Sequence, residues 1–304
     1  MSMKALLDVP APAKLNLFLH ITGQRADGYH LLQSVFMLID WCDTLHFERR
    51  GDGQISRHDL TAELPADDLC LRAARLLQAE SATTLGADIS IAKHVPWGAG
   101  MGGGSSDAAS TLLALNRLWG LNWPLSKLLP FGLKLGADVP FFLSGHNAWV
   151  EGVGEKLTAV NLPARKFAVV KPAASLETRV VFGGVALVRN TPAATLKGFT
   201  AHSNAARDRG KRLLGFGRND LQPVGEIHCA EVSQAAEMLQ SVFGHSRMTG
   251  SGSAVFAEYG GRDFELESSA FLAAVALLPS TWVTRMCGNL PQHPLAGWST
   301  PTIS

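Results

Sequence analysis

Residues 13–21, AKLNLFLHI, alternate between aliphatic side chains and side chains that are mostly polar. A period of two predicts a β-strand, because successive side chains of a strand point to opposite faces. One face would carry Leu15, Leu17, Leu19 and Ile21, and the other would carry Lys14, Asn16, Phe18 and His20. Lys14 and Asn16 therefore point to the same side, about 7 Å apart along the strand. An Asp-Gly turn follows within GQRADGYH at 23–30.

The remaining pattern predicts a mixture of strands and helices. Strands are expected at 34–40 and 44–50, joined by a short link at 41–43, and at 89–95, 147–153, 167–171, 253–259 and 281–286. Helical spacing is found at 68–80, 105–119, 126–135, 230–242 and 265–278, and Pro130 is expected to delay or kink the third of these helices. Because strands and helices do not alternate regularly, the pattern favours an α+β fold over a doubly wound parallel sheet.

Two segments lack a clear pattern. Residues 183–218 include the charged run RDRGKR, which is expected to be a solvated loop. The stretch after Gly288 is rich in Pro, Gly, Ser and Thr and is expected to be loose. The length of 304 residues favours two domains, and the best boundary lies near 155–166, which divides the chain into 1–160 and 161–304.

Composition and charge narrow the classes of function. With 27 Lys and Arg against 26 Asp and Glu, the net charge of +1 gives no basic field for nucleic acid or an anionic membrane. The four cysteines form no C-x-x-C pair and the ten histidines form no H-E-x-x-H pair, which argues against a metal site and suits a reducing compartment. The N-terminus lacks an export signal, and the longest apolar run, 270–278, is far shorter than the ~20 residues that span a bilayer. We therefore expect a soluble, cytoplasmic protein.

The segment with the clearest chemistry is rich in glycine. Six of the seven residues from Gly98 to Gly104 are Gly or Ala, and they lead into Ser105 and Ser106 at the start of a predicted helix. A backbone without side chains can approach a ligand closely and aim several N–H groups at it. The helix N-terminus adds about half a positive charge and the hydroxyls add donors, so the segment is suited to bind phosphate.

Two common phosphate-binding motifs fit this segment poorly. A literal G-x-G-x-x-G is present, but no acidic residue lies between Asp107 and Asp138 to hold the ribose of a dinucleotide. A Walker A loop needs Gly-Lys before its Ser or Thr, and here Gly104 is followed directly by Ser105. The longer pattern PWGAGMGGGSSDAA, at 96–109, is more specific than either fragment.

Taken whole, this pattern resembles the phosphate loop of the GHMP kinases, the superfamily of galactokinase, homoserine kinase, mevalonate kinase and phosphomevalonate kinase. APAKLNLFL at 11–19 and MTGSGSAVFAEY at 248–259 agree with it. GQRADGYHLLQSVF at 23–36 and LGADVPFFLSGHNAWVEGVGEKL at 135–157 look like the 4-diphosphocytidyl-2-C-methyl-D-erythritol kinases of that superfamily, which phosphorylate a tertiary alcohol in the non-mevalonate isoprenoid pathway. The five blocks together extend over most of residues 10–259.

The resemblance implies a two-domain fold, with an ATP-binding α+β domain at 1–160, a ferredoxin-like domain at 161–304 and the active site in the cleft between them. It implies ATP as the phosphoryl donor, with Mg²⁺ carried by the nucleotide and touching Ser106. The residues that would surround ATP are Lys93, Pro96, Trp97, Gly98, Ala99, Gly100, Met101, Gly102, Gly103, Gly104, Ser105 and Ser106. Trp97 and Met101 depart from the residues usual in the family, which bears on the shape of the adenine pocket.

Two residues match the family's catalytic groups, Lys14 its lysine and Asp138 its aspartate. A carboxylate can accept the proton of the attacking hydroxyl, and an ammonium group can stabilise the alkoxide and the transferred phosphoryl. A carboxylate beside a cation is a weak base, so orienting the hydroxyl is expected to be the larger contribution of Asp138. Considered alone, Asp138 could be a helix N-cap and Lys14 a surface lysine, but the motif context favours catalysis.

The cytidine end of the substrate is the part specific to this family. Tyr29 and Phe182 match the residues that stack on the two faces of cytosine, and His30 matches one that hydrogen-bonds to it. Stacking of a base on an aromatic ring is worth ~1–3 kcal/mol. Further substrate contacts are implied at Asn16, near the erythritol hydroxyls, and at Thr178, Gly250, Ser251 and Gly252; Asn219 also falls in a matching position.

Two other functions remain open. The chain could be another GHMP kinase acting on a different small alcohol, and competition by CDP or CMP would separate the two. It could also be a non-catalytic nucleotide-binding sensor, but such a protein would be expected to have lost Lys14 or Asp138, and both are present. In each case the expected partner is a small molecule, with no nucleic acid or membrane, and the chain is expected to be a monomer or homodimer.

Overall fold

The first half of the chain is built on a six-stranded sheet. The computed structural model describes residues 3–207, 211–260 and 264–299. The strands of this sheet are β1 (Ala5–Gln24), β2 (His30–Arg50), β3 (Ile55–Asp59), β4 (Gly86–Ala92), β5 (Ala148–Glu151) and β6 (Lys156–Ala159). They are ordered β3-β4-β2-β5-β6, with β1 antiparallel to β2 along its length and β3 parallel to β4.

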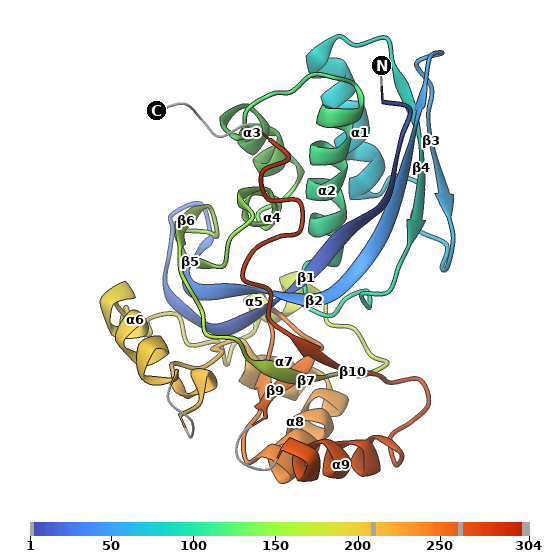
Figure 1. Cartoon of the computed structure of the whole chain (residues 1–304). Helices are drawn as coiled ribbons and strands as arrows, with labels where there is room; N and C mark the ends of the chain where they lie inside the picture. Colours follow the sequence, from blue (N-terminus) through green and yellow to red (C-terminus); the bar gives the residue numbers. More distant parts are fainter. Residues whose placement is uncertain (1–2, 208–210, 261–263, 300–304) are drawn as a thin grey trace.

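Four helices lie on one side of this sheet (Figure 1). They are α1 (Leu69–Ser81), α2 (Gly103–Leu118), α3 (Leu125–Leu135) and α4 (Val139–Ser144). α1 begins one residue after the predicted start because the Asp68 side chain caps it by accepting from the backbone N–H of Leu71. α3 contains Pro130 and still begins at Leu125, so the proline does not delay its start.

The second half forms a four-stranded sheet of order β10-β7-β9-β8. Its strands are β7 (Lys166–Lys171), β8 (Arg247–Met248), β9 (Val255–Tyr259) and β10 (Val283–Gly288). The helical elements of this half are α5 (Thr178–Gly183), α6 (Leu196–Ala205), the 3₁₀ turn η1 (Leu213–Gly215), α7 (Gln222–His228), α8 (Ala230–Phe243) and α9 (Phe264–Val275). The two helix-covered sheets confirm the α+β class.

Three clusters of buried side chains hold these elements together. One fills the space between the first sheet and helices α1–α4, and another lies within the second half around β7, β9 and α8. The third joins the halves, because Leu15 and Trp149 of the first sheet lie in the same cluster as Phe167 and Phe256 of the second. Burial of these large side chains holds the two sheets against each other.

Residues 30–50 form one continuous strand, so the expected break at 41–43 is wrong. Cys42 and Asp43 of the link pair with Pro12 and Ala11 of β1, next to an irregularity in the register. Asp43, the charged residue of the link, is fully buried, and its Oδ1 accepts the backbone N–H groups of His94 and Val95 at 2.6 and 2.8 Å. A buried carboxylate with such partners can remain inside a strand, which the local pattern does not indicate.

Residues 183–218 are more regular than predicted, because α6 and η1 lie within them. Of the charged run at 207–212, residues 208–210 lie outside the described part of the structure. The segment packs partly in the core, since Phe199 and Leu213 are buried. Because its elements are short and the spacing of its apolar residues is mixed, the periodicity of the sequence does not reveal these two buried residues.

The stretch after Gly288 is also not loose, at least through residue 299, because it returns to the first half and packs there. The backbone N–H of Leu290 donates to the carbonyl oxygen of Leu38 at 2.9 Å, and that of His293 donates to Gly145 at 2.8 Å. The Asn147 side chain links both sides, accepting from the Leu38 N–H and donating to the Leu290 carbonyl oxygen, each at 2.8 Å. Leu295 lies in the hydrophobic core of the first half.

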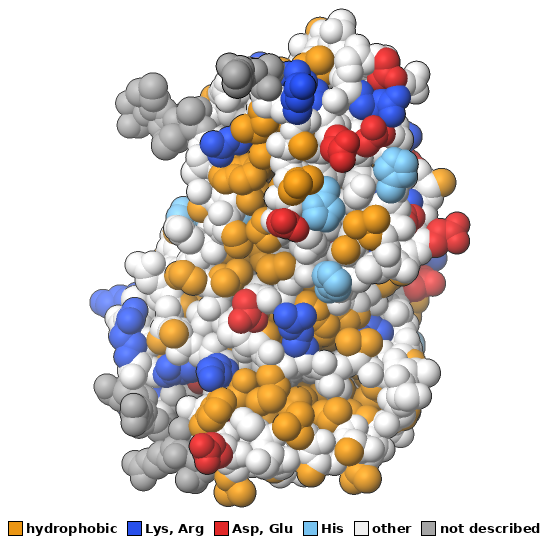
Figure 2. Space-filling model, turned by 45° about the vertical axis from the view of Figure 1, so that its right-hand side comes forward, with side chains coloured by type: hydrophobic (Ala, Val, Ile, Leu, Met, Phe, Trp, Pro, Cys, Tyr) orange, Lys and Arg blue, Asp and Glu red, His pale blue; other side chains and the backbone are white. Residues whose placement is uncertain are grey.

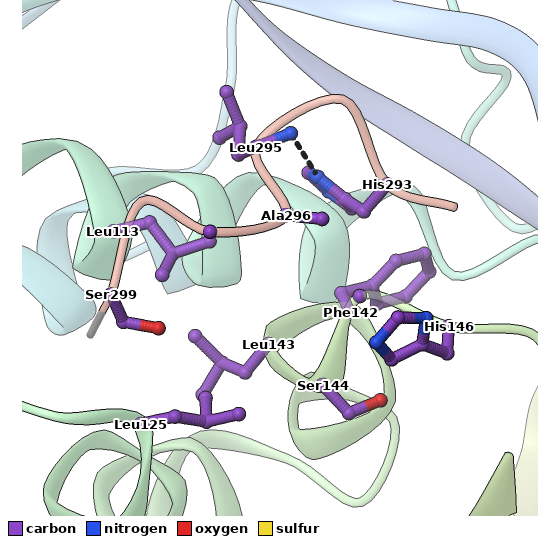
Figure 3. A pocket seen from close by; sticks show the side chains of 12 residues that line it. Leu113, Leu125, Phe142, Leu143, Ser144, His146, His293, Leu295, Ala296 and Ser299 are labelled. Carbon is purple, nitrogen blue, oxygen red and sulfur yellow. Dashed lines mark hydrogen bonds between the residues drawn. The ribbon is translucent and has the colours of Figure 1, made fainter. Parts of the chain in front are cut away.

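A cavity of about 180 Å³ separates this returning segment from α2, α3 and α4 (Figure 3). Leu113, Leu125 and Leu143 line it with other apolar side chains, and none of the site residues predicted above does so. His293 belongs to its wall and is 1% exposed, and its Nδ1 accepts from the Leu295 N–H at 3.1 Å. Burial lowers the pKa of His293 to about 4.

This buried histidine makes stability depend on pH. Its pKa of about 4 in the folded chain lies below the ordinary value of 6.5. Between these two pH values the histidine is therefore protonated in the unfolded chain and neutral in the folded chain. The free energy of unfolding should therefore fall by up to about 3 kcal/mol as the pH falls from about 6.5 to about 4. Urea unfolding at several pH values measures this loss.

The variant His293→Asn isolates the contribution of the histidine, because its Oδ1 can still accept the Leu295 N–H while no group titrates there. Its free energy of unfolding should depend on pH less steeply than that of the parent chain over the same range. Equal slopes for the two proteins would contradict the assignment to His293.

Several large apolar side chains remain exposed on the second half. Leu266 and Leu272 of α9 are 70% and 61% exposed, and Leu277 is 87% exposed. Figure 2 shows hydrophobic side chains gathered on the lower part of the molecule, where Figure 1 shows α8 and α9. Among the described helices, none is both long and apolar enough to cross a membrane.

Candidate active site

The glycine-rich loop at 98–104 leads from the end of β4 into α2, and its backbone is fixed by both halves of the chain. The carbonyl oxygen of Met101 accepts from the N–H of Lys14 in β1 at 2.9 Å. The carbonyl oxygens of Gly98 and Ala99 accept from the N–H groups of Ser253 and Ala254, at 3.1 and 3.3 Å. Met101 is itself buried, so the loop is held in place before any ligand binds.

Glycine is required in this loop by conformation and by space. Gly100 and Gly102 have φ angles of +71° and +72°, in the left-handed region that favours glycine. A Cβ atom on Gly100 would lie 2.2 Å from the carbonyl oxygen of Thr249, and one on Gly102 would lie 3.0 Å from the ring of Phe142. At Gly100 and Gly102 the loop therefore has no room for a side chain.

The predicted start of α2 at residue 105 is two residues late. The helix begins at Gly103, and its N-cap is Gly102, which has no side chain to bond the first-turn N–H groups. These N–H groups and the helix dipole make the end of α2 suitable for an anion. Ser106 Oγ and Asp107 Oδ1 are buried there, and each lacks a hydrogen-bond partner among the described residues.

The predicted catalytic pair comes together beside this loop. Lys14 Nζ lies 3.6 Å from Asp138 Oδ2 and 2.5 Å from Asn16 Oδ1, which confirms that Lys14 and Asn16 share a face of β1. The Lys14 side chain is buried, and its Cε lies 3.4 Å from the Cβ position of Gly102. The ammonium group also lies 4.7 Å from the ring centroid of Phe36.

Burial and the neighbouring Asp138 act in opposite directions on the pKa of Lys14. Burial lowers the pKa of Lys14, and the charge and hydrogen bond of Asp138 oppose that change. Asp138 precedes α4 at its N-cap position, but its side chain makes no capping hydrogen bond and is 30% exposed. Its carboxylate therefore remains available to Lys14 and to a substrate.

A second glycine turn, at 249–253, closes the other side of the site. Asn219 Nδ2 donates to the carbonyl oxygens of Met248 and Gly250, at 2.7 and 2.8 Å, so its role is to fix this turn. Ser251 Oγ lies 2.9 Å from Thr178 Oγ1 of α5. The two glycine segments are in direct contact, since a Cβ on Gly250 would lie 2.8 Å from the carbonyl oxygen of Gly100.

Lys93 lies beneath the loop in a buried ion-pair network. Its Nζ contacts Asp43, and lies 2.6 Å from Asp107 Oδ2 in the first turn of α2. Burial alone would lower the pKa of Lys93, but the two carboxylates outweigh it and the pKa is raised. Burial also raises the pKa of Asp107, against the opposing charge of Lys93. The network ties β2, β4 and α2 together at the base of the loop.

Lys93 also lines a cleft of about 470 Å³ outside the loop. Pro96 and Trp97 form part of its wall, and Trp97 is 63% exposed. Leu64 and Pro65, from the segment before α1, line the cleft as well. It is an open, largely apolar cleft, and Trp97 in its wall is followed directly in the chain by Gly98, the first residue of the glycine loop.

The residues predicted to hold cytosine lie at the start of β2 and in α5. Tyr29 is 65% exposed, whereas the rings of His30 and Phe182 pack with centroids 5.3 Å apart. Arg189, from the unpatterned segment, donates from Nε to His30 Nε2 at 3.1 Å. Burial and the charge of Arg189 lower the pKa of His30.

Two family models and several curated proteins match this chain. The family model described as GHMP kinases N terminal domain matches residues 68–146, and GHMP kinases C terminal matches residues 199–276. A curated protein of Methylibium petroleiphilum, 4-diphosphocytidyl-2-C-methyl-D-erythritol kinase, is 63% identical over 98% of this chain and 100% of its own length. The chain belongs to the 4-diphosphocytidyl-2-C-methyl-D-erythritol kinase family of GHMP kinases.

Solved structures agree as well. A 4-(cytidine 5'-diphospho)-2C-methyl-D-erythritol kinase aligns with a TM-score of 0.75 and 30% identity over 92% of this chain and 98% of its own. A homoserine kinase from Cytophaga hutchinsonii aligns with a TM-score of 0.69 and 16% identity over 96% of this chain and 97% of its own, a likeness of fold alone. The chain is thus a GHMP kinase in sequence and fold, and GHMP kinases use ATP.

Four residues near the site were missed by the sequence argument. Thr249 Oγ1 accepts the Asn16 N–H at 3.0 Å, and Ser175 lies against Gly98, where a Cβ would approach its Oγ to 2.6 Å. Asp43 forms an ion pair with Lys93, and Arg189 donates a hydrogen bond to His30. Of these four, only Thr249 lies in a motif named above, MTGSGSAVFAEY at 248–259, so this motif was the only feature of the sequence that could have indicated one of them.

Proposed function

We propose that this kinase transfers the γ-phosphate of ATP to the 2-hydroxyl of 4-diphosphocytidyl-2-C-methyl-D-erythritol, giving the 2-phosphate and ADP, in the non-mevalonate isoprenoid precursor pathway. The observation that carries the proposal is the Lys14–Asp138 pair, 3.6 Å apart, beside Gly102 of the glycine loop. Release of ADP with this alcohol, compared with homoserine and mevalonate, tests it. Equal or faster release with either of the other alcohols would contradict the substrate.

ATP would bind with its phosphates in the glycine loop and its adenine in the adjoining cleft. The uncapped first turn of α2 supplies N–H donors for the β- and γ-phosphates. Trp97 and Pro96 supply an apolar wall of suitable size for a purine in the cleft of about 470 Å³. Lys93 would stabilise the base of the loop through its ion pairs with Asp43 and Asp107.

Mg²⁺ fits the same place. Ser106 Oγ is a buried hydroxyl without a partner in the described part of the chain, and such a group calls for a ligand. Ser106 would hold the ion together with the nucleotide, and the ion would neutralise charge on the β- and γ-phosphates.

Lys14 and Asp138 would act on the alcohol. In phosphoryl transfer the protein mainly positions the reactants and stabilises charge. Asp138 accepts a hydrogen bond from the hydroxyl and takes its proton as the bond to phosphorus forms. Lys14 stabilises negative charge on the attacking oxygen and on the transferred phosphoryl, and Asn16 fixes the ammonium group by its 2.5 Å hydrogen bond.

The cytidine end would bind near α5 and the start of β2. Tyr29, which is exposed, would stack on one face of the base, and Phe182, which packs against His30, would stack on the other. Gly250, Ser251 and Gly252, with Thr178, would line the path from this end to the reacting hydroxyl. The partner is thus a small molecule with a cytidine diphosphate group, and we expect a cytoplasmic monomer or homodimer with no nucleic acid partner.

Phe182→Ala should raise KM for the cytidyl substrate by roughly 5- to 150-fold, because base stacking is worth ~1–3 kcal/mol. KM for ATP should hold, since Phe182 lies in α5 rather than beside the loop. Steady-state kinetics with each substrate varied in turn measures both constants. Phe264→Ala, which removes a partly exposed ring from α9, is the control. Equal increases in both KM values would refute the stacking role.

A further inference from the structure

Arg189 joins the turn after α5 to the start of β2. Its guanidinium donates four hydrogen bonds: Nε to His30 Nε2 at 3.1 Å, and the terminal nitrogens to the carbonyl oxygens of Leu187, Gly184 and Phe182 at 3.2, 3.1 and 3.3 Å. A guanidinium held by three carbonyl groups has a fixed position and orientation. Arg189 therefore fixes the His30 ring beside Phe182.

The hydrogen bond also fixes the tautomer of His30. Arginine has donors and no acceptor, so Nε2 of His30 must be the unprotonated nitrogen that accepts. A neutral ring then carries its proton on Nδ1. Burial and the Arg189 charge both oppose a second proton on this ring, since they lower its pKa. No hydrogen bond from Nδ1 is formed within the described residues, so this N–H remains a donor for a ligand.

A donor at this position distinguishes two pyrimidines. N3 of cytosine is an acceptor, whereas N3 of uracil carries a hydrogen and is a donor. We propose that Arg189 is the positioning residue that makes the enzyme select cytosine over uracil, by holding His30 as an Nδ1–H donor directed at N3 of the base. The inference rests on the proposed function for the identity of the base, but not for the tautomer.

Loss of Arg189 would release this constraint. A His30 ring without the guanidinium can place its proton on Nε2 and offer Nδ1 as an acceptor, which suits N3–H of uracil. Sites built to hydrogen-bond a ligand group discriminate strongly because the wrong ligand leaves a buried polar group unpaired. Selectivity should therefore fall when the tautomer is no longer fixed.

The first test reads the tautomer and needs no catalysis. The ¹⁵N chemical shifts of the His30 ring should report a neutral Nδ1–H tautomer in the intact kinase, and Arg189→Met should shift the population toward Nε2–H. Arg189→Lys, which can still donate one bond to Nε2, should keep the Nδ1–H form. An Nε2–H tautomer in the unmodified protein would overturn the proposal whether or not any variant folds.

The second test reads selectivity by calorimetric binding of CMP and UMP. The unmodified kinase should bind CMP at least ~10-fold more tightly than UMP, and Arg189→Met should bring the two constants within about 3-fold of each other. Arg189→Lys should retain most of the preference. Arg207→Met, which removes an exposed arginine after α6, controls for the loss of one positive charge.

These outcomes separate the two proposals. An unchanged CMP-to-UMP ratio in a folded Arg189→Met would overturn the role of Arg189 even if the kinase phosphorylates the cytidyl alcohol. Failure of the alcohol to be phosphorylated, with CMP still preferred through Arg189, would refute the substrate and leave the base selectivity standing. Equal binding of CMP and UMP to the unmodified protein would remove the basis of the inference.

Discussion

Asp138→Asn should lower kcat by at least ~10²-fold, as loss of a positioned proton acceptor should, while the affinity for ATP is kept. The asparagine keeps the shape of the side chain at the start of α4 but can neither take the proton nor balance the charge of Lys14. Measurement of kcat by ADP release and of ATP binding by calorimetry tests both parts. Activity within a few-fold of the parent chain would remove Asp138 from the mechanism.

The same variant has a consequence for pH dependence. Burial lowers the pKa of Lys14 and Asp138 raises it, so removal of the carboxylate should lower that pKa further. The protonated fraction of Lys14 then falls at a lower pH, and the alkaline limb of kcat should move toward lower pH in Asp138→Asn. Asp67→Asn, on the surface before α1, should leave the limb unchanged. Identical profiles would argue against the coupling of the two groups.

Gly100→Ala should lower kcat/KM for ATP by about 10²-fold, because a displacement of about 1 Å in a positioning element costs this much. The added Cβ would lie 2.2 Å from the carbonyl oxygen of Thr249, and the φ angle of +71° is strained for alanine. The loop must therefore move away from the second glycine turn. ATP binding and kinetics, with thermal unfolding to establish that the variant is folded, measure the effect.

Gly104→Ala offers a comparison within the same loop. Its Cβ would lie 3.8 Å from Leu69 Cδ1, its φ is not positive, and α2 has already begun at this residue. Its loss of kcat/KM should be at least ~10-fold smaller than that of Gly100→Ala, since alanine is favoured inside a helix. Equal losses would mean that the lack of side chains, rather than the contact with Thr249, determines binding.

Local pattern predicted the parts of the site that lie on one element. The alternation in β1 placed Lys14 and Asn16 on one face, and their 2.5 Å contact confirms it. The glycine composition of 98–104 likewise indicated a loop with few side chains, and the close approach of Thr249 requires glycine at position 100. These features depend on neighbours in sequence, so period and composition reveal them.

Features that depend on distant residues were not predictable in this way. Asp43 looked like part of a link, but it is buried by its contacts with Lys93 and the N–H groups that follow it. Arg189 lies in a segment without a pattern and meets His30 only because α5 and β2 come together in the fold. The division into 1–160 and 161–304 remains a prediction, and residues 290–299 pack on the first half rather than the second.

The return of residues 290–299 to the first half affects how the chain folds while it is being synthesised. Leu295 completes a core whose other buried members lie between Val9 and Val150 and are synthesised much earlier. The Asn147 side chain cannot donate to the Leu290 carbonyl oxygen until that residue has been made. Domains generally fold in order as they leave the ribosome. Here the N-terminal half leaves the ribosome before the C-terminal residues that complete its core have been synthesised. A nascent chain halted at residue 288 should be more readily cleaved by protease within its first half than one halted beyond residue 299.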